Sequence, residues 1–225
     1  MGEPEGVKLL SRHGKVLLPT NHGSNYSFSS AIRIARLEPP APPPAPPLER
    51  DKIYVALTLS DGDNQILWPK FFRRYVEHPA FGTFPLALGM GPAIRELQPA
   101  VAQWYYEQAT PQTEFFADVS GAGYINPEHF GAECRDREEV WQDYLAWTRR
   151  LMEPLGQRTI RTVRGADADL ARYARALPFC HSIVADMGRY SGREGIMNLS
   201  YAFPDGMPVF RAATSWRHGK DGFLR

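Results

Sequence analysis

Short apolar runs alternate with amphipathic helical stretches over most of the chain, and this alternation constrains the fold more than any other feature. The apolar runs cover residues 52–60, 84–91, 114–121, 158–165 and 180–188. The helical stretches cover residues 69–76, 100–109, 137–156 and 167–177. Strands that alternate with helices are typical of βα units, so the pattern predicts an α/β fold with a parallel sheet.

The number of strands indicates a barrel that falls short of closure. Two further apolar runs at residues 195–203 and 207–216 bring the expected total to six or seven. A closed (β/α)8 barrel needs eight strands and about 250 residues. We therefore expect a TIM-barrel-like (β/α) repeat domain over residues 51–225, incomplete within this chain.

The first fifty residues have a different composition. Residues 38–49, EPPAPPPAPPLE, hold seven of the chain's 20 prolines, which favours extended polyproline II structure and a linker over 38–50. Before it, residues 15–18 and 26–34 have the alternation of short strands. Residues 1–37 are thus expected to be the tail or edge strands of a preceding domain.

Charge and composition exclude several classes of partner. The net charge is +1 and no run of Lys or Arg is present, so we expect no nucleic-acid partner. No stretch of 18 apolar residues occurs, so no membrane partner is expected either. Cys134 and Cys180 are 46 residues apart and the histidines are scattered. This spacing supports no zinc site, and we expect no cofactor and no metal.

The first apolar run ends in the residues DGDN, and the two carboxylates of this motif are candidates for catalysis. If the strand continues extended through Gly62, Asp61 and Asp63 point to the same side. Two close carboxylates raise the pKa of one of them, which gives one proton donor and one acceptor, as glycoside hydrolysis requires. Asp118 and Asp186 lie near the ends of the third and fifth runs and are the candidate cross-strand partners. The alternatives are a turn or capping role for the DGDN pair and an interior salt bridge for Asp118.

Residues beside these strand ends are expected to bind the substrate. They are Asn64, Trp68, Ser120, Gly121, Gly123 and Tyr124. Trp68 follows DGDN directly and is expected to stack on a sugar ring, whereas Tyr124 either contacts the sugar or fills the end of the barrel. The two glycines permit positive φ and a close approach of the backbone.

Two of these motifs together resemble a known family. The third run ends in SGAGYINP at residues 120–127 and the first in SDGDN at 60–64. The chain is similar, over about residues 20–216, to the bacterial GxGYxYP proteins, described as putative glycoside hydrolases. Gly121, Gly123, Tyr124 and Pro127 match the motif, and Asn126 stands where the family has a second tyrosine.

The resemblance implies a fold like a TIM barrel and a carbohydrate substrate. It also implies a longer parent protein with additional preceding domains. These would hold any secretion signal, and the parent would then be secreted or periplasmic. We therefore expect a glycoside hydrolase that acts on a poly- or oligosaccharide. The alternatives are a non-catalytic carbohydrate-binding module and a divalent-metal-dependent hydrolase with Asp61 and Asp63 as ligands.

Overall fold

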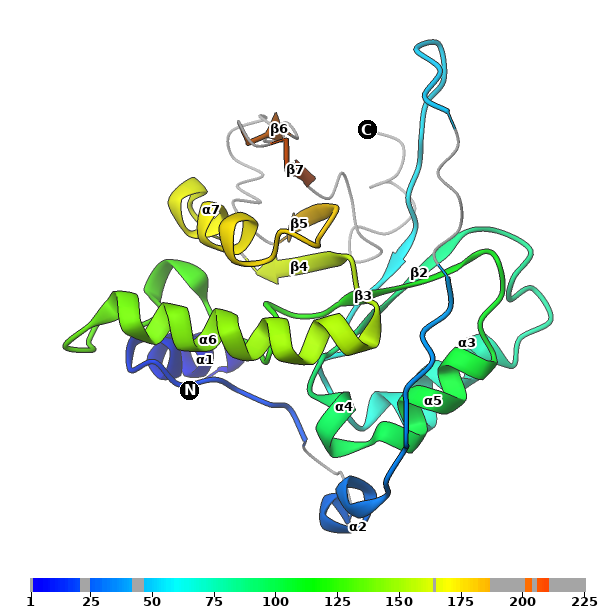
Figure 1. The fold of residues 1–225 in the computed structure, drawn as a ribbon, viewed down its shortest axis with the longest axis horizontal. Helices are drawn as coiled ribbons and strands as arrows, with labels where there is room; N and C mark the ends of the chain where they lie inside the picture. Colours follow the sequence, from blue (N-terminus) through cyan, green and yellow to red (C-terminus); the bar gives the residue numbers. More distant parts are fainter. Residues whose placement is uncertain are drawn as a thin grey trace.

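A curled sheet of mostly parallel strands forms the centre of the protein (Figure 1). The computed structural model describes residues 2–20, 25–41, 47–163, 165–186, 201–203 and 206–210. Within these residues the strand order is β1-β2-β3-β4-β5-β7-β6, with β6 antiparallel to β7 and all other neighbours parallel. The strands are β1 (Thr58–Leu59), β2 (Leu86–Met90), β3 (Thr113–Ala117), β4 (Thr159–Val163), β5 (Ser182–Asp186), β6 (Tyr201–Ala202) and β7 (Pro208–Phe210).

The prediction of an α/β fold with a parallel sheet is confirmed, and the sheet is half of a barrel. Six parallel strands curl, with β1 and β6 at the two edges of the described sheet. Strands were predicted at all seven places, although parts of the last three, at 187–188, 195–200 and 211–216, lie outside the described residues. The described strands resemble a TIM barrel in connectivity but do not form a closed one.

The helices follow the strands and cover the convex face of the sheet (Figure 1). They are α3 (Arg73–Val76), α4 (Ile94–Leu97), α5 (Pro99–Glu107), α6 (Arg137–Met152) and α7 (Asp167–Ala176), with a π-helical turn at Trp68–Phe72 and 3-10 turns at Pro127–His129 and Glu153–Leu155. Asp136 caps α6 by accepting a hydrogen bond from the Glu139 amide. The four predicted helices are thus confirmed.

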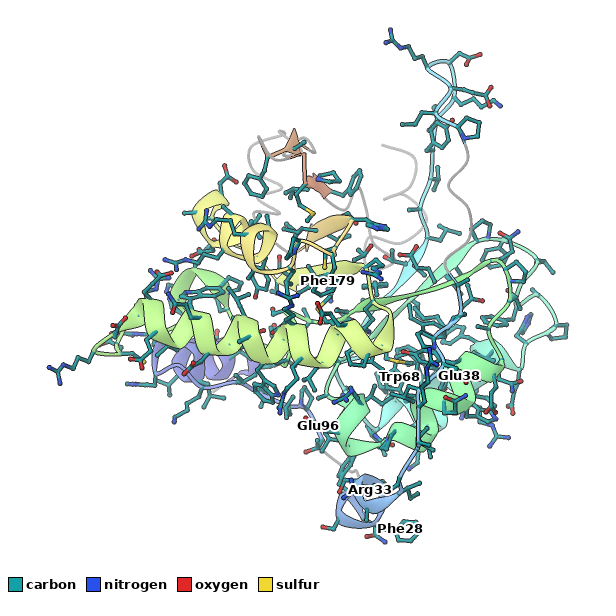
Figure 2. All side chains as sticks on the ribbon, viewed as in Figure 1. Phe28, Arg33, Glu38, Trp68, Glu96 and Phe179 are labelled. Carbon is teal, nitrogen blue, oxygen red and sulfur yellow. The ribbon has the colours of Figure 1, made fainter. Side chains whose placement is uncertain are left out.

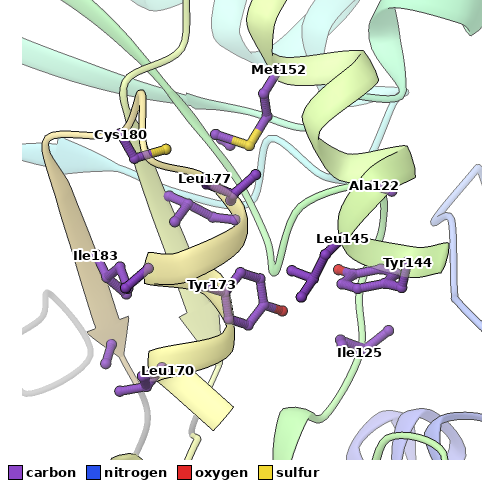
Figure 3. Close-up of a cluster of buried hydrophobic side chains, with 14 of the residues drawn as sticks. Ala122, Ile125, Tyr144, Leu145, Met152, Leu170, Tyr173, Leu177, Cys180 and Ile183 are labelled. Atoms are coloured by element: carbon purple, nitrogen blue, oxygen red, sulfur yellow. The ribbon is translucent and has the colours of Figure 1, made fainter. Parts of the chain in front are cut away.

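Alternate residues of each strand point to opposite faces, which separates the core from the site. Leu88, Ile160 and Ile183 point toward the helices and are at most 1% exposed. Figure 3 shows Ile183 in the cluster beneath α6 and α7, where Tyr173 lies opposite Leu145. The concave face carries the other set of residues, several of them polar.

The first strand is shorter than predicted. Only Thr58 and Leu59 pair with β2. Residues 47–57 form an arm that projects from the sheet (Figure 1), and Ile53 is 93% exposed. An apolar sequence alone does not make a strand, because a strand also needs a neighbour for its backbone hydrogen bonds.

The prediction of short strands before residue 37 is wrong for residues 26–34. These residues begin with α2 (Tyr26–Ala31), because the side chain of Asn25 accepts a hydrogen bond from the Phe28 amide and starts a helix. A further helix, α1 (Glu3–Arg12), precedes it. In the first predicted strand only Leu17 forms a β-bridge, to Tyr124.

The helices described here give no sign of a membrane-spanning segment: none combines the length and the apolar character that a bilayer crossing needs.

Candidate functional site

A tight turn after β1 brings two carboxylates to the carboxyl-terminal edge of the sheet. Asp61 has a positive φ of 74°, and the Asn64 amide donates a hydrogen bond of 3.2 Å to the Asp61 carbonyl oxygen. The chain therefore turns at Asp61, and the expected extended course through Gly62 is wrong. Asp61 ends up exposed and Asp63 half-buried.

Three glycines allow this turn to lie directly on β2. The Gly91 amide donates to the Gly62 carbonyl oxygen at 2.9 Å. A Cβ on Gly62 would lie 1.4 Å from the Gly89 carbonyl oxygen, and a Cβ on Gly91 would lie 2.8 Å from the Asp63 Cα. Side chains at these positions would thus displace the turn and the carboxylates with it.

Asp118 follows β3 and is the buried anchor of the site. It is 0% exposed, and its Oδ1 accepts from the Arg161 Nη1 at 2.6 Å. Its Oδ2 accepts from the Gly62 amide at 3.2 Å. Burial raises the pKa of Asp118 and the Arg161 guanidinium opposes this effect. Because a guanidinium does not deprotonate, we assign Asp118 as its ionised counter-ion.

Asp63 is the titratable group of the site. Its pKa is raised to about 7, first by burial and then by the negative charges of Asp118 and Asp61, while Arg161 lowers it. A carboxyl group with such a pKa exists in both protonation states near neutral pH, as a general acid requires. Asp61, Asp63 and Asp118 are hereafter called the Asp cluster.

Trp68 does not offer the stacking face that we expected. It is 0% exposed, and its ring packs against Phe72 and Tyr105 with centroid distances of 4.7 and 4.6 Å. Its indole Nε1–H donates to the Gly62 carbonyl oxygen at 2.8 Å. Trp68 therefore supports the turn from below instead of contacting a ligand.

Ser120 is also buried, so the expected contact with a sugar hydroxyl is contradicted. Its hydroxyl donates to the Ile125 carbonyl oxygen at 3.1 Å, and it is 0% exposed. Its own carbonyl oxygen accepts from the hydroxyl groups of Tyr144 and Tyr173. These bonds fix the loop after β3 to α6 and α7.

The glycines of the GxGY segment have packing roles. Gly121 has a φ of 115°, and a Cβ there would lie 2.5 Å from the Thr148 side chain on α6. A Cβ on Gly123 would lie 2.5 Å from Val16. Tyr124 exchanges two backbone hydrogen bonds with Leu17. The segment thus fastens the N-terminal stretch and α6 to the sheet.

Two predicted site residues remain at the edge of the sheet. Asn64 is half-buried in the DGDN turn, and its side-chain oxygen accepts a 3.4 Å hydrogen bond from the Ile66 amide. Asp186 is the last residue of β5, and its backbone is in register with Val163. The side chain of Asp186 lies outside the described part of the structure.

Arg161 is the site residue that our sequence analysis missed. Its signal is a charged residue in the middle of an apolar strand, TIRTV, where only a paired charge is stable.

A second finding concerns metals. The described residues contain no group of three or more His, Cys, Asp or Glu side chains that could hold a metal ion.

The raised pKa of Asp63 predicts that Asp63→Asn stabilises the folded protein at high pH. In the folded state Asp63 stays protonated up to about pH 7, whereas in the unfolded state it ionises near its ordinary pKa of about 4. The free energy of unfolding therefore falls as the pH rises from about 4 to 7. Asn is neutral and of the same shape, so at pH 8 we expect a gain of about 1–2 kcal/mol, discounted for the solvent that reaches Asp63.

Urea denaturation at pH 4, 6 and 8 measures this effect. The matched control is Asp143→Asn on the exposed face of α6. For Asp143→Asn we expect a change that does not grow with pH. A stability difference for Asp63→Asn that stays constant from pH 4 to 8 would show that the pKa of Asp63 is not raised by folding.

The geometry defines a class of protein: an α/β half-barrel with acidic residues at the carboxyl ends of its strands, where parallel α/β folds bind ligands. The comparison with protein families gives the particular family. Residues 51–218 match the GxGYxYP putative glycoside hydrolase C-terminal domain, and the chain belongs to this family.

A solved structure extends the similarity to most of the chain. A crystal structure of a putative hydrolase from Bacteroides thetaiotaomicron VPI-5482 is 26% identical in sequence and superposes with a TM-score of 0.78. The match covers 92% of this chain and 39% of that protein, so the chain spans well under half of the longer protein's length. None of the curated proteins matches.

Proposed function

We propose that this domain is a glycoside hydrolase in which Asp63 is the general acid and Asp61 the second carboxylate. The observation that carries the proposal is the half-buried Asp63, with a pKa raised to about 7, in one turn with the exposed Asp61. Membership of a family described as putative glycoside hydrolases supports the substrate class.

Each carboxylate has a distinct role in this mechanism. Protonated Asp63 donates its proton to the glycosidic oxygen as the bond to the anomeric carbon breaks. Exposed Asp61 either attacks the anomeric carbon or deprotonates the attacking water, and Asp186 is the alternative for this role. Asp118 is a positioning residue, because it holds Gly62 and its charge raises the pKa of Asp63.

The substrate in this proposal is a poly- or oligosaccharide. Asn64 and Tyr124 are the remaining candidates for contacts with sugar hydroxyls. Trp68 and Ser120 contribute from beneath the surface, by holding the DGDN turn and the loop after β3.

The test is the release of new reducing ends from a panel of oligosaccharides. We expect the double variant Asp61→Asn, Asp63→Asn to lose turnover at least about 1,000-fold, since removing a general acid alone costs about 100- to 10,000-fold. Unchanged turnover of a cleaved substrate by this variant contradicts the proposal.

Two other outcomes would favour the alternative functions. Saturable binding of a glycan without new reducing ends would indicate a carbohydrate-binding module. Loss of turnover with a chelator, restored by calcium or magnesium, would indicate a metal-dependent hydrolase.

A further inference from the structure

A cavity of about 740 Å³ lies between the N-terminal segment and the helices that follow β2. Residues 30–39 form one wall, and α4, the start of α5 and the turn after α6 form the other. No residue of the Asp cluster lines it. Its volume is within the range of about 300–1,000 Å³ that small-molecule sites occupy.

Three arginines that form no ion pair among the described residues line this cavity. They are Arg33 and Arg36 after α2, and Arg95 on α4. Across the ranges that the structure describes, none of their guanidinium groups forms an ion pair. The whole chain has a net charge of only +1, so this positive charge is a local feature.

The two acidic residues of the cavity are already neutralised from outside it. Glu96 accepts from the Arg150 Nη2 at 3.2 Å, and Glu153 accepts from the Arg149 Nε at 2.8 Å. Figure 2 shows Arg33 beside α2 and Glu96 above it on α4. The charge that faces the cavity is therefore positive.

Apart from Ser30, the rest of the lining is aliphatic. Ile32, Leu37, Pro39 and Pro99 contribute aliphatic surface between the arginines. Guanidinium groups bind carboxylate and sulfate oxygens through paired hydrogen bonds, and aliphatic surface packs against the C–H face of a sugar ring. A charged sugar satisfies both parts of this lining.

We propose that the cavity is a subsite for an anionic sugar unit, either a uronate or a sulfated sugar. This inference rests on the proposed function, because it names the class of glycan that the hydrolase would bind. The proposal predicts that the domain binds an acidic glycan more tightly than a neutral one.

A chain of buried amides connects the cavity wall to the proposed acid. Pro99 lines the cavity, and the neighbouring Gln98 donates from its side chain to the Gln65 carbonyl oxygen at 2.8 Å. The Gln65 side chain donates to the Asp63 carbonyl oxygen at 3.1 Å. Gln65 and Gln98 are 0% and 6% exposed. The subsite and the DGDN turn are thus held in a fixed relation.

The experiment measures the binding of three disaccharides to the full chain by calorimetry at 0.15 M salt. The probes are digalacturonate, a heparin-derived sulfated disaccharide and neutral cellobiose. We expect one or both anionic probes to bind, and the one that binds more tightly identifies uronate or sulfate as the preferred group. The double variant Arg33→Glu, Arg36→Glu is expected to weaken that binding at least about tenfold, as the loss of charge-assisted hydrogen bonds predicts.

Matched controls separate the cavity from general charge effects. Arg74→Glu changes an exposed arginine of α3 that does not line the cavity, and we expect less than about twofold weakening. Arg33→Lys keeps the charge and loses the paired donors, so it should fall between wild type and the charge reversal. Thermal melts verify that each variant is folded.

Three results would overturn the inference. The first is no binding of either anionic disaccharide at about 10 mM, a concentration that would nearly saturate a site with a millimolar Kd. The second is equal binding by the double variant. The third is displacement of the disaccharide by an equal concentration of inorganic sulfate. Binding is also measured on Asp63→Asn, which retains the cavity. Loss of disaccharide binding would thus contradict the cavity proposal, whereas loss of turnover with binding retained would concern only the proposed catalysis.

Discussion

Replacement of Arg161 by Met is expected to lower the free energy of unfolding by about 3–5 kcal/mol, since breaking a buried ion pair leaves an uncompensated charge. The charge left behind is that of Asp118, which is 0% exposed and lies 2.6 Å from the guanidinium. Urea denaturation at pH 7 measures the loss.

Two further variants make this result interpretable. Arg149→Met removes an exposed ion pair to Glu153 on the surface of α6, and we expect a loss of less than about 1 kcal/mol. The double variant Asp118→Leu, Arg161→Met removes both buried charges and should recover part of the stability lost by Arg161→Met alone. If Arg161→Met lowered the free energy of unfolding by less than about 1 kcal/mol, the interpretation that the buried charge of Asp118 depends on Arg161 would be wrong.

The same pair explains why the site was only partly predictable from sequence. The alternation of strands and helices places Asp118 near a strand end, and an interior salt bridge was one of the two roles left open. Its partner comes 43 residues later. Only the register of β3 and β4, Ala117 beside Ile160, brings the two together, and strand register depends on the assembled sheet.

The role of Trp68 was misjudged for a local reason. Its position after the DGDN turn suggested an exposed ring at the mouth of the barrel. Phe72 follows four residues later, however, and this spacing places both side chains on one face of a helix. That face is buried against Tyr105. The helical spacing was thus a better guide than the proximity to the turn.

The N-terminal residues show where propensity alone fails. Tyr26 and Phe28 alternate with serines, and Arg33 lies between Ile32 and Ile34, which is consistent with a strand. The capping residue Asn25 favours a helix instead, and none of the described strands pairs with residues 26–34. Strand prediction was reliable for β2, β4 and β5, each of which has strands on both sides.

Gly62→Ala is expected to destabilise the protein by about 3 kcal/mol and to reduce turnover at least about 100-fold. The new Cβ would lie 1.4 Å from the Gly89 carbonyl oxygen and 2.8 Å from the Trp68 ring. These neighbours belong to the sheet and the core, so the turn must move instead. Asp63 then loses its burial and its place beside Asp118, which are the two largest causes of its raised pKa.

Gly6→Ala is the matched control, because it makes the same chemical change where space is free. A Cβ on Gly6 would have no atom within 4 Å, and Gly6 lies inside α1, where Ala favours the helix by about 1 kcal/mol. We expect this variant to be slightly more stable than wild type, with unchanged turnover. If Gly62→Ala kept both stability and turnover, the turn would not depend on its contact with β2. The geometry proposed for Asp63 would then be wrong.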